Sequence, residues 1–193
     1  VGKIMTEIKD LGLDKNTLVI FTSDTGPHAA GGHDATFFNS SGPFRGIKRD
    51  VYEGGIREPF VARWPGHIEP STISNHVAYF PDFLPTAAAL AGVKPPSNID
   101  GISFLPALLG DTKDQAQHQY LYWEFFENGS SQAVRFGDWK AVRMPMITGQ
   151  IQLYNLNADP GELHDVAGER PDVVARAAGY VKEAHVASKD FRA

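Results

Sequence analysis

The spacing of apolar residues predicts a helix followed by a strand at the start of the chain. Residues 1–10 place Ile4, Ile8 and Leu11 on one face, which is the pattern of an amphipathic helix. The apolar run at 17–22 shows no polar alternation, as expected of a strand buried on both faces in a parallel sheet that helices cover. The chain is therefore expected to begin inside a domain of the α/β class.

A long polar interval separates this strand from the next apolar segments. Residues 26–55 are rich in glycine and show little periodicity, and such a stretch in a compact domain is usually functional or disordered. Its aromatic residues argue against disorder; they are Phe37, Phe38, Phe44 and Tyr52. Beyond it we predict a strand at 59–64 and a helix at 82–91, which ends at Gly92, a common C-terminal cap.

The C-terminal part of the chain predicts a small antiparallel sheet. Four short runs of β-forming residues are separated by turn signals, among them Asn128-Gly129 and Gly137-Asp138. The predicted strands cover residues 119–126, 132–136, 139–144 and 150–155. Loop-like sequence at 112–118 places a boundary there, so we expect two domains, 1–112 and 113–193.

A terminal helix is predicted at 171–188. Proline is favoured in the first turn of a helix, and Pro171 stands at that position. Helical spacing then turns one apolar face inward; that face consists of Val173, Val174, Ala177 and Val181.

Composition narrows the classes of function. The chain has 193 residues and a net charge of −5, which argues against a nucleic-acid-binding scaffold. It has no cysteine, so it contains no disulfide, thiolate metal site or thiol nucleophile. No apolar run approaches the roughly 20 residues of a membrane span, and the first residues lack the features of a signal peptide.

Positive charge is concentrated in one glycine-rich segment. Five cationic residues fall within 19 positions: Arg45, Lys48, Arg49, Arg57 and Arg63. In an acidic chain this cluster fits a site for a small anion, because glycines let the backbone approach the ligand. A solvated charged face is the alternative. Lys48 is the candidate for binding a tetrahedral oxyanion, whereas Arg45 and Arg57 are expected to pair with carboxylates, namely Glu53, Glu58 or Asp50.

Asp24 and two histidines are further candidates. Asp24 follows the predicted strand at 17–22, and ligands of open α/β sheets bind outside the carboxyl ends of strands. Its carboxylate suits Ca²⁺ or Mg²⁺, although an Asp that caps a turn has the same pattern. His28 and His33 lie in the polar loop, where a role in a site is favoured. The other histidines are interpreted as structural or surface residues: His67, His76, His118, His164 and His185.

Several ordered blocks of sequence resemble the sulfatase family, within the alkaline-phosphatase-like superfamily. Residues 16–26, Asn-Thr-Leu-Val-Ile-Phe-Thr-Ser-Asp-Thr-Gly, resemble the strand of that family that ends in Ser-Asp-Asn-Gly. Gly42–Pro65 resembles its signature Gly-x-Leu-Arg-Gly-x-Lys…Tyr-Glu-Gly-Gly-x-Arg-x-Pro…Trp-Pro-Gly. Further similar blocks lie at 76–90, 100–105, 124–143 and 153–166, so the resemblance spans nearly the whole chain.

This resemblance implies a fold and an activity. The fold would be part of an alkaline-phosphatase-like mixed sheet covered by helices, with a small C-terminal antiparallel sheet and a terminal helix. Residues 1–112 would be the C-terminal part of a sulfatase catalytic domain. The activity would be metal-assisted hydrolysis of sulfate esters by a formylglycine nucleophile. Many relatives are exported, so a periplasmic or secreted location is expected for the full-length protein.

The resemblance also implies roles for individual residues. Asp24 would be a calcium ligand, with Mg²⁺ as the alternative ion, and Lys48 would be the catalytic residue that binds the substrate sulfate. Thr25 stands where the family usually has an Asn ligand, and its hydroxyl is a poorer oxygen donor. His28 and His33 would line the substrate pocket. The substrate would be a sulfated small molecule or a sulfated glycan.

The family's N-terminal half has no counterpart in this sequence. That half carries the formylglycine and would be the partner of this chain, so the chain alone is expected to be inactive. Two other functions remain open: a phosphoester hydrolase of the same superfamily, and a non-catalytic module that binds sulfated glycans.

Overall fold

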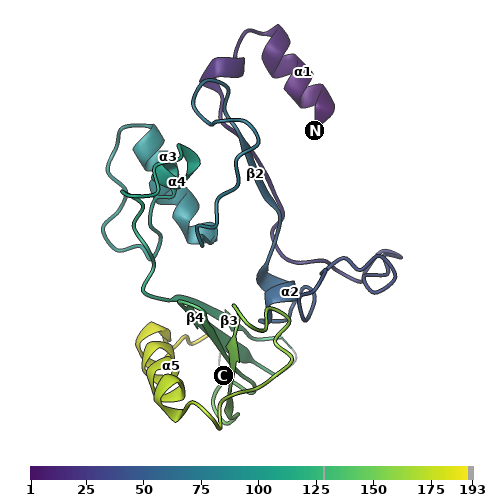
Figure 1. The fold of residues 1–193 in the computed structure, drawn as a ribbon, viewed down its shortest axis with the longest axis vertical. Helices are drawn as coiled ribbons and strands as arrows, with labels where there is room; N and C mark the ends of the chain where they lie inside the picture. Colours follow the sequence, from purple (N-terminus) through teal and green to yellow (C-terminus); the bar gives the residue numbers. More distant parts are fainter. Residues whose placement is uncertain (128, 191–193) are drawn as a thin grey trace. The chain divides into compact units, whose positions relative to one another are not determined.

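The structure is a computed structural model, which describes residues 1–127 and 129–190. The chain forms two compact units (Figure 1). The first unit comprises residues 1–22 and 59–118, and the second comprises 23–58 and 119–193. These units group the residues differently from the predicted domains 1–112 and 113–193, and that division into domains stays a prediction.

The first unit contains a two-stranded sheet next to the N-terminal helix. Helix α1 spans Gly2–Asp10, as predicted, and the short 3-10 helix η1 spans Asp14–Asn16. Strands β1 (Val19–Thr22) and β2 (Phe60–Arg63) pair antiparallel, with Ile20 opposite Ala62.

The expectation of a parallel pairing with both faces of β1 buried was wrong for this pair. The strands are antiparallel, and the Phe21 side chain is 50% exposed. The apolar run at 17–22 indicated a strand, but the pattern of one segment does not determine its partner or what covers it.

The rest of the first unit is helical. The short 3-10 helix η2 spans Phe80–Asp82 and leads into α3, which spans Phe83–Leu90 where a helix was predicted. A short helix that was not predicted, α4 (Leu105–Leu108), packs against α3.

The second unit is built on a four-stranded antiparallel sheet. Its strands β3 (Leu121–Phe125), β4 (Ser131–Phe136), β5 (Trp139–Arg143) and β6 (Ile151–Asn155) are hydrogen-bonded in that order, which confirms the predicted sheet. The predicted turn at Gly137-Asp138 joins β4 to β5, with Gly137 at a φ of +55°. In the turn predicted at Asn128-Gly129, Asn128 lies outside the described residues.

Both faces of this sheet are covered, because side chains alternate between faces along each strand. Helix α5 (Pro171–Ala184) covers one face, with Val173, Ala177 and Val181 buried in an apolar cluster against the sheet. The sheet contributes Val134, Phe136, Ala141 and Leu153 to that cluster. The neighbouring residues point the other way and form a second cluster with Val51 and Tyr52; they are Ala133, Val142 and Tyr154.

The second cluster matters for function, because Val51 and Tyr52 belong to the predicted glycine-rich anion segment. Most of residues 26–52 is irregular, as predicted, and the segment ends in the short helix α2 (Glu53–Ile56). The sheet therefore serves as the base on which this segment rests. In the described part of the chain, none of the helices has the length and apolar character that a membrane crossing requires.

Candidate functional site

Two backbone hydrogen bonds bring Asp24 and Lys48 into one site. The Gly26 N–H donates to the carbonyl oxygen of Gly55 at 3.0 Å, and the Lys48 N–H donates to the carbonyl oxygen of Pro27 at 2.8 Å. The turn after Asp24 is thereby fixed against the glycine-rich segment. The site is thus built from two stretches of the second unit, 23–27 and 45–58.

Glycine is required where these stretches meet. A Cβ atom at Gly26 would lie 1.9 Å from the Gly54 carbonyl oxygen, and one at Gly54 would lie 2.3 Å from the Gly46 carbonyl oxygen. Both neighbours are backbone atoms, which cannot rotate away as a side chain can. Any other residue at Gly26 would force the two stretches apart, and any other residue at Gly54 would distort the stretch 45–58 itself.

Asp24 and Lys48 form an open ion pair. Lys48 Nζ lies 3.3 Å from Asp24 Oδ2, and the side chains are 35% and 80% exposed. The hydrogen bond from Lys48, together with its charge, lowers the pKa of Asp24 below the ordinary value, so the carboxylate is ionised at neutral pH. Both charges stay accessible to a ligand. The structure thus brings together the predicted metal ligand and the predicted sulfate-binding lysine.

Glu58 is a second carboxyl group in this region, and sequence reasoning did not assign it to the site. Burial, and to a smaller extent the negative charge of Asp24, raise its pKa to about 7. In the sequence it lies directly before Pro59, within Gly42–Pro65, and it was considered there only as a possible partner of Arg45 or Arg57. Only the fold shows that Glu58 is close enough to Asp24 for that charge to raise its pKa.

His28 is held by Arg49 beside this ion pair. Arg49 Nη1 lies 3.0 Å from His28 Nε2, and the Ala30 N–H donates to His28 Nδ1 at 2.9 Å. Arg49 in turn donates from Nε to Glu127 Oε2 at 2.6 Å. Both imidazole nitrogens of His28 face donors, but a neutral imidazole has one acceptor nitrogen. It can therefore accept a hydrogen bond in one of the two contacts and not in both. Sequence reasoning named Arg49 only as one of the five clustered cations and did not find Glu127.

His33 lies elsewhere on the loop. Its Nε2 is 3.0 Å from Ser40 Oγ, and its ring stacks on Phe38 with centroids 5.3 Å apart. These contacts do not join it to Asp24 or Lys48. The predicted role of His33 in a substrate pocket therefore stays a prediction.

The donor set at Asp24 fits part of a calcium site. Asp24 supplies an ionised carboxylate, and the Thr25 hydroxyl donates to the Gly26 carbonyl oxygen at 3.0 Å, which leaves its oxygen lone pairs available. Hard oxygen atoms of this kind suit Ca²⁺ and Mg²⁺, but either ion needs about six ligands. Across residues 1–127 and 129–190, no group of three or more histidine, cysteine, aspartate or glutamate side chains could hold a metal ion.

A cavity of about 270 Å³ opens on the segment that precedes Lys48. No charged side chain is among the residues that line it. Its lining consists of Ala35, Thr36, Asn39, Ser41, Gly42, Phe44, Gly46 and Ile47.

The predicted cluster of five cations is divided by the fold. Arg57 pairs with Glu53 at 3.9 Å, which confirms the expected structural role. Arg45 was expected to pair with a carboxylate, but among the described residues it instead donates to the Tyr154 hydroxyl at 3.2 Å and to the Glu162 carbonyl at 3.1 Å. Arg63 belongs to the first unit and pairs with Asp14. Lys48 and Arg49 are therefore the cations that remain beside Asp24 and His28.

Comparison with known proteins identifies the family. Residues 45–178 match the model of the family described as "N-sulphoglucosamine sulphohydrolase, C-terminal". The chain belongs to the sulfatase family. Human arylsulfatase A is 38% identical to it, in an alignment that covers 90% of this chain and 39% of that protein.

Solved structures of sulfatase-like enzymes share this fold. A structure described as Ps i-CgsB in complex with k-i-k-neocarrahexaose has a TM-score of 0.80 at 28% identity, covering 94% of this chain and 39% of that one. A structure of BT4656 in complex with its substrate D-glucosamine-2-N,6-O-disulfate has a TM-score of 0.77 at 25% identity, covering 94% and 36%. The alkaline-phosphatase-like fold class predicted from sequence is confirmed. The chain spans about two fifths of the length of these relatives.

Proposed function

We propose that this chain supplies the sulfate-binding and part of the metal-binding machinery of a sulfuric ester hydrolase. The observation that carries the proposal is the exposed Asp24–Lys48 pair at 3.3 Å. Lys48 lies within residues 45–178, which the family model matches, and Asp24 lies before them. Lys48 would bind the sulfate group of the substrate as a compact point charge. Arg49 and His28 would flank that group, and Glu127 would orient Arg49.

Asp24 and Thr25 would hold one side of a calcium ion, with Mg²⁺ as the alternative. When bound, the ion would withdraw negative charge from the sulfate and so assist its transfer. The Lys48 ammonium would also stabilise the negative charge of the sulfate. A cation that is already in place near developing charge needs no reorganisation during the reaction. Thr25 in place of an amide side chain weakens this part of the ligand set.

The nucleophile is expected in another part of a longer protein, as a formylglycine. That part would complete the metal site and would be the partner of this chain, in a periplasmic or secreted enzyme. The substrate would be a sulfated sugar or another small sulfate ester, since BT4656 is described with a disulfated glucosamine as its substrate. Measurable turnover of a chromogenic sulfate ester by the purified 193-residue chain would contradict this division of roles.

The direct test is a titration of the chain with sodium sulfate, followed by two-dimensional NMR. Saturable shifts of amides near Lys48 are expected, and Lys48→Ala should abolish them while Lys15→Ala, which changes an exposed lysine, should not. Equal binding by wild type and Lys48→Ala would contradict the proposal. Inorganic phosphate in a parallel titration tests the alternative of a phosphoester hydrolase, which predicts preference for phosphate.

Calcium titrations test the metal role. Asp24→Asn should remove any saturable binding, whereas Thr25→Asn should strengthen it by offering an amide oxygen in place of a hydroxyl. A non-catalytic module for sulfated glycans would bind sulfate through Lys48 without any dependence on calcium. That outcome would favour the module over the enzyme.

A further inference from the structure

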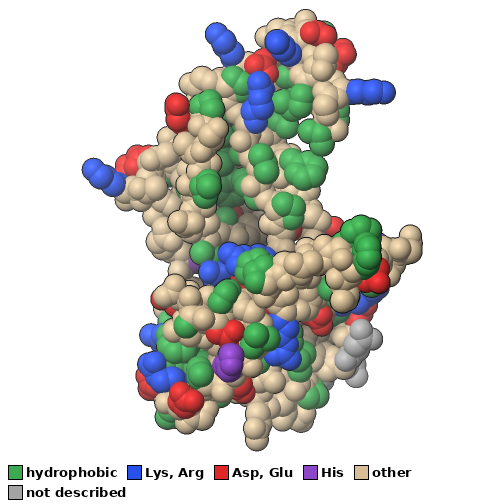
Figure 2. Space-filling view, turned by 45° about the vertical axis from the view of Figure 1, so that its right-hand side comes forward, with side chains coloured by type: hydrophobic (Ala, Val, Ile, Leu, Met, Phe, Trp, Pro, Cys, Tyr) green, Lys and Arg blue, Asp and Glu red, His purple; other side chains and the backbone are tan. Residues whose placement is uncertain are grey.

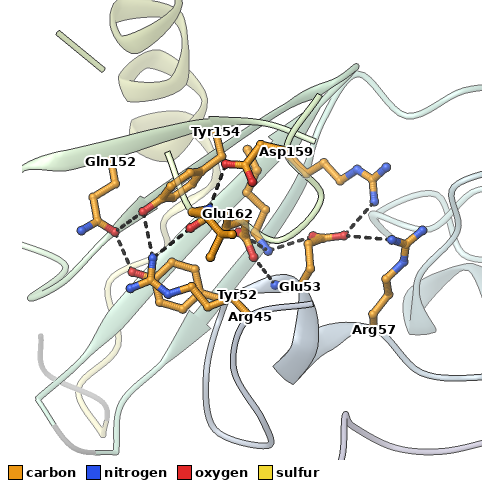
Figure 3. A network of polar contacts seen from close by, with 11 residues as sticks. Arg45, Tyr52, Glu53, Arg57, Gln152, Tyr154, Asp159 and Glu162 are labelled. Carbon is orange, nitrogen blue, oxygen red and sulfur yellow. Dashed lines mark hydrogen bonds and ion pairs between the residues drawn. The ribbon is translucent and has the colours of Figure 1, made fainter. Parts of the chain in front are cut away.

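A buried cluster of charges joins the glycine-rich segment to the sheet of the second unit (Figure 3). Glu53, Lys140 and Glu162 are all less than 3% exposed. Lys140 Nζ lies 2.9 Å from Glu53 Oε1 and 3.4 Å from Glu162 Oε1. Arg135 and Arg57 approach the other oxygen of Glu53, at 3.4 Å and 3.9 Å.

The pKa values of the two carboxyl groups in this cluster shift in opposite directions. Burial alone would raise the pKa of Glu53, but the charges of Lys140, Arg135 and Arg57 outweigh it and lower the pKa. Glu162 is paired with Lys140 alone among the cations, and there burial prevails and raises the pKa. Glu53 is thus the firmly ionised centre of the cluster.

Stability of the fold is a weak reason for such a cluster. Desolvation of buried charges offsets most of their attraction, and well-packed apolar groups usually serve stability as well. The cluster's position indicates a different role. Glu53 is the first residue of helix α2 in the stretch 45–58, which is called the site segment below. Lys140 lies on β5, and Glu162 lies in the turn that follows β6.

Glu162 holds the site segment at two points. Its carboxylate accepts the Glu53 N–H at 2.6 Å, and its carbonyl oxygen accepts a hydrogen bond from Arg45 at 3.1 Å. Glu162 adopts a φ of +52°, which is uncommon for residues other than glycine. In this conformation both its carboxylate and its carbonyl group point at the segment. The turn also lies close to the start of the segment, since a Cβ at Gly161 would be 3.0 Å from the Pro43 carbonyl oxygen.

The backbone carries this attachment to the ion pair. Glu53 is followed by Gly54, whose N–H donates to the Arg45 carbonyl at 2.7 Å, and by Gly55, whose carbonyl accepts the Gly26 N–H. Asp24 lies two residues before Gly26. Displacement of Glu53 would therefore move the backbone that holds Asp24 opposite Lys48.

We propose that Lys140 and Glu162 are positioning residues, which hold Glu53 and thereby set the distance between Asp24 and Lys48. The structural part of this inference stands alone; its relevance to sulfate binding rests on the proposed function. Neither residue touches the ion pair, so both would act through Glu53 and the glycines that follow it.

Hydrogen exchange of the 193-residue chain tests the inference, with Glu162→Gln as the main variant because it preserves size and an acceptor for the Glu53 N–H. The Gly26 and Gly54 amides should exchange about tenfold faster, while amides of β4 and β5 keep their protection. Glu169→Gln, at an exposed position, is the matched control. Lys140→Met should give a larger effect of the same kind, and Lys182→Met is its control.

Two results would overturn the positioning role. One is unchanged exchange at Gly26 and Gly54 in Glu162→Gln; the other is an equal loss of protection throughout the sheet, which would mark a residue that only supports the fold. A sodium sulfate titration of the same variant separates the two proposals. Faster exchange at Gly26 and Gly54 with no sulfate binding even by wild type would support positioning and contradict the proposed function, whereas weaker sulfate binding by Glu162→Gln supports both.

Discussion

The second unit packs its sheet between two apolar clusters, whereas the first unit leaves many of its large apolar side chains at the surface. In the second unit Val134 and Leu153 are fully buried against helix α5. In the first, α1 buries none of its residues, and Phe21, Val61 and Phe83 are each at least half exposed. Figure 2 shows hydrophobic side chains of this kind at the surface on the face it presents.

The first unit is organised instead by a buried carboxylate. Asp82 is 0% exposed and accepts hydrogen bonds from the N–H groups of Tyr79 and Ile102, at 3.0 and 2.8 Å. His118 Nε2 lies 2.9 Å from both of its oxygens. One polar side chain thus ties together the loop before η2, the loop before α4 and the end of the unit.

This difference explains why the candidate site lies in the second unit. A site that must keep two charges about one hydrogen-bond length apart needs a rigid base. The sheet of the second unit supplies one, because Val51 and Tyr52 of the site segment are packed into its apolar cluster. The first unit has no comparable apolar cluster among the residues that the structure describes.

The largest effect is expected from Leu153→Ala. This fully buried side chain lies in the cluster beneath α5, so its truncation should cost about 3 kcal/mol of unfolding free energy for the second unit. Hydrogen exchange of β4 and β5 amides measures the loss. Leu163→Ala, at a position 75% exposed in the same unit, should cost less than about 0.5 kcal/mol. Similar costs for both would show that the packing described for β6 is wrong.

Asp82→Asn is expected to have the next largest effect, and to act on the first unit alone. An amide offers one oxygen and turns its NH₂ group toward a donor, which should cost about 2 kcal/mol. Amides around α3 should exchange faster while those of β4 and β5 stay unchanged. The control is Asp100→Asn, at an exposed position of the same unit. A loss of protection in both units would contradict their separate organisation.

A smaller effect, which depends on pH, is expected from Glu58→Gln. The pKa of Glu58 is raised from 4.5 to about 7 in the folded protein, so its contribution to stability is full below pH 4.5 and is lost as pH rises through 7. The variant should therefore gain stability relative to wild type between pH 4.5 and 7, by about 1 kcal/mol after allowance for solvent screening. Urea unfolding at several pH values measures it. Glu69→Gln, an exposed control, should show no such trend, and a constant difference for Glu58→Gln would contradict the assignment.

The smallest effect on stability is expected from Val61→Lys. Val61 is 60% exposed on β2, so a charge there should change the unfolding free energy by less than about 0.5 kcal/mol. Its effect should appear in self-association, because exposed apolar strands promote it and a lysine blocks it. Analytical ultracentrifugation measures this. Val186→Lys, which changes an exposed residue of the second unit, should leave self-association as it is.

The sequence predicted best what is local. Strands β3–β6 followed from short runs of β-forming residues between turn signals, and α5 followed from its apolar spacing, since both patterns reflect neighbours within a few residues. The pairing of β1 with β2 could not be predicted, because 37 residues separate Thr22 from Phe60 and the partner of a strand is a long-range choice. Helix α4 was missed because four residues give too short a pattern.

The site divides in the same way. Asp24 and Lys48 were candidates because the sequence around each is typical of a site, and the fold brings them together. Glu127 and Glu58 were missed, since each is an ordinary surface carboxylate until the fold places it near Arg49 or Asp24. Lys140 was missed for a related reason. A lysine in a strand is expected to face water, and only the structure shows that this one is buried and paired with Glu53.

The contact of Gly26 with Gly54 and Gly55 joins the two halves of the site entirely through main-chain atoms. Side chains of the loop between 28 and 44 take no part in this joint. Residues of the loop between 28 and 44 can therefore change in size and chemistry without altering the separation of carboxylate and ammonium. Under the proposed function, one charge arrangement would then serve sulfate esters of many different alcohols.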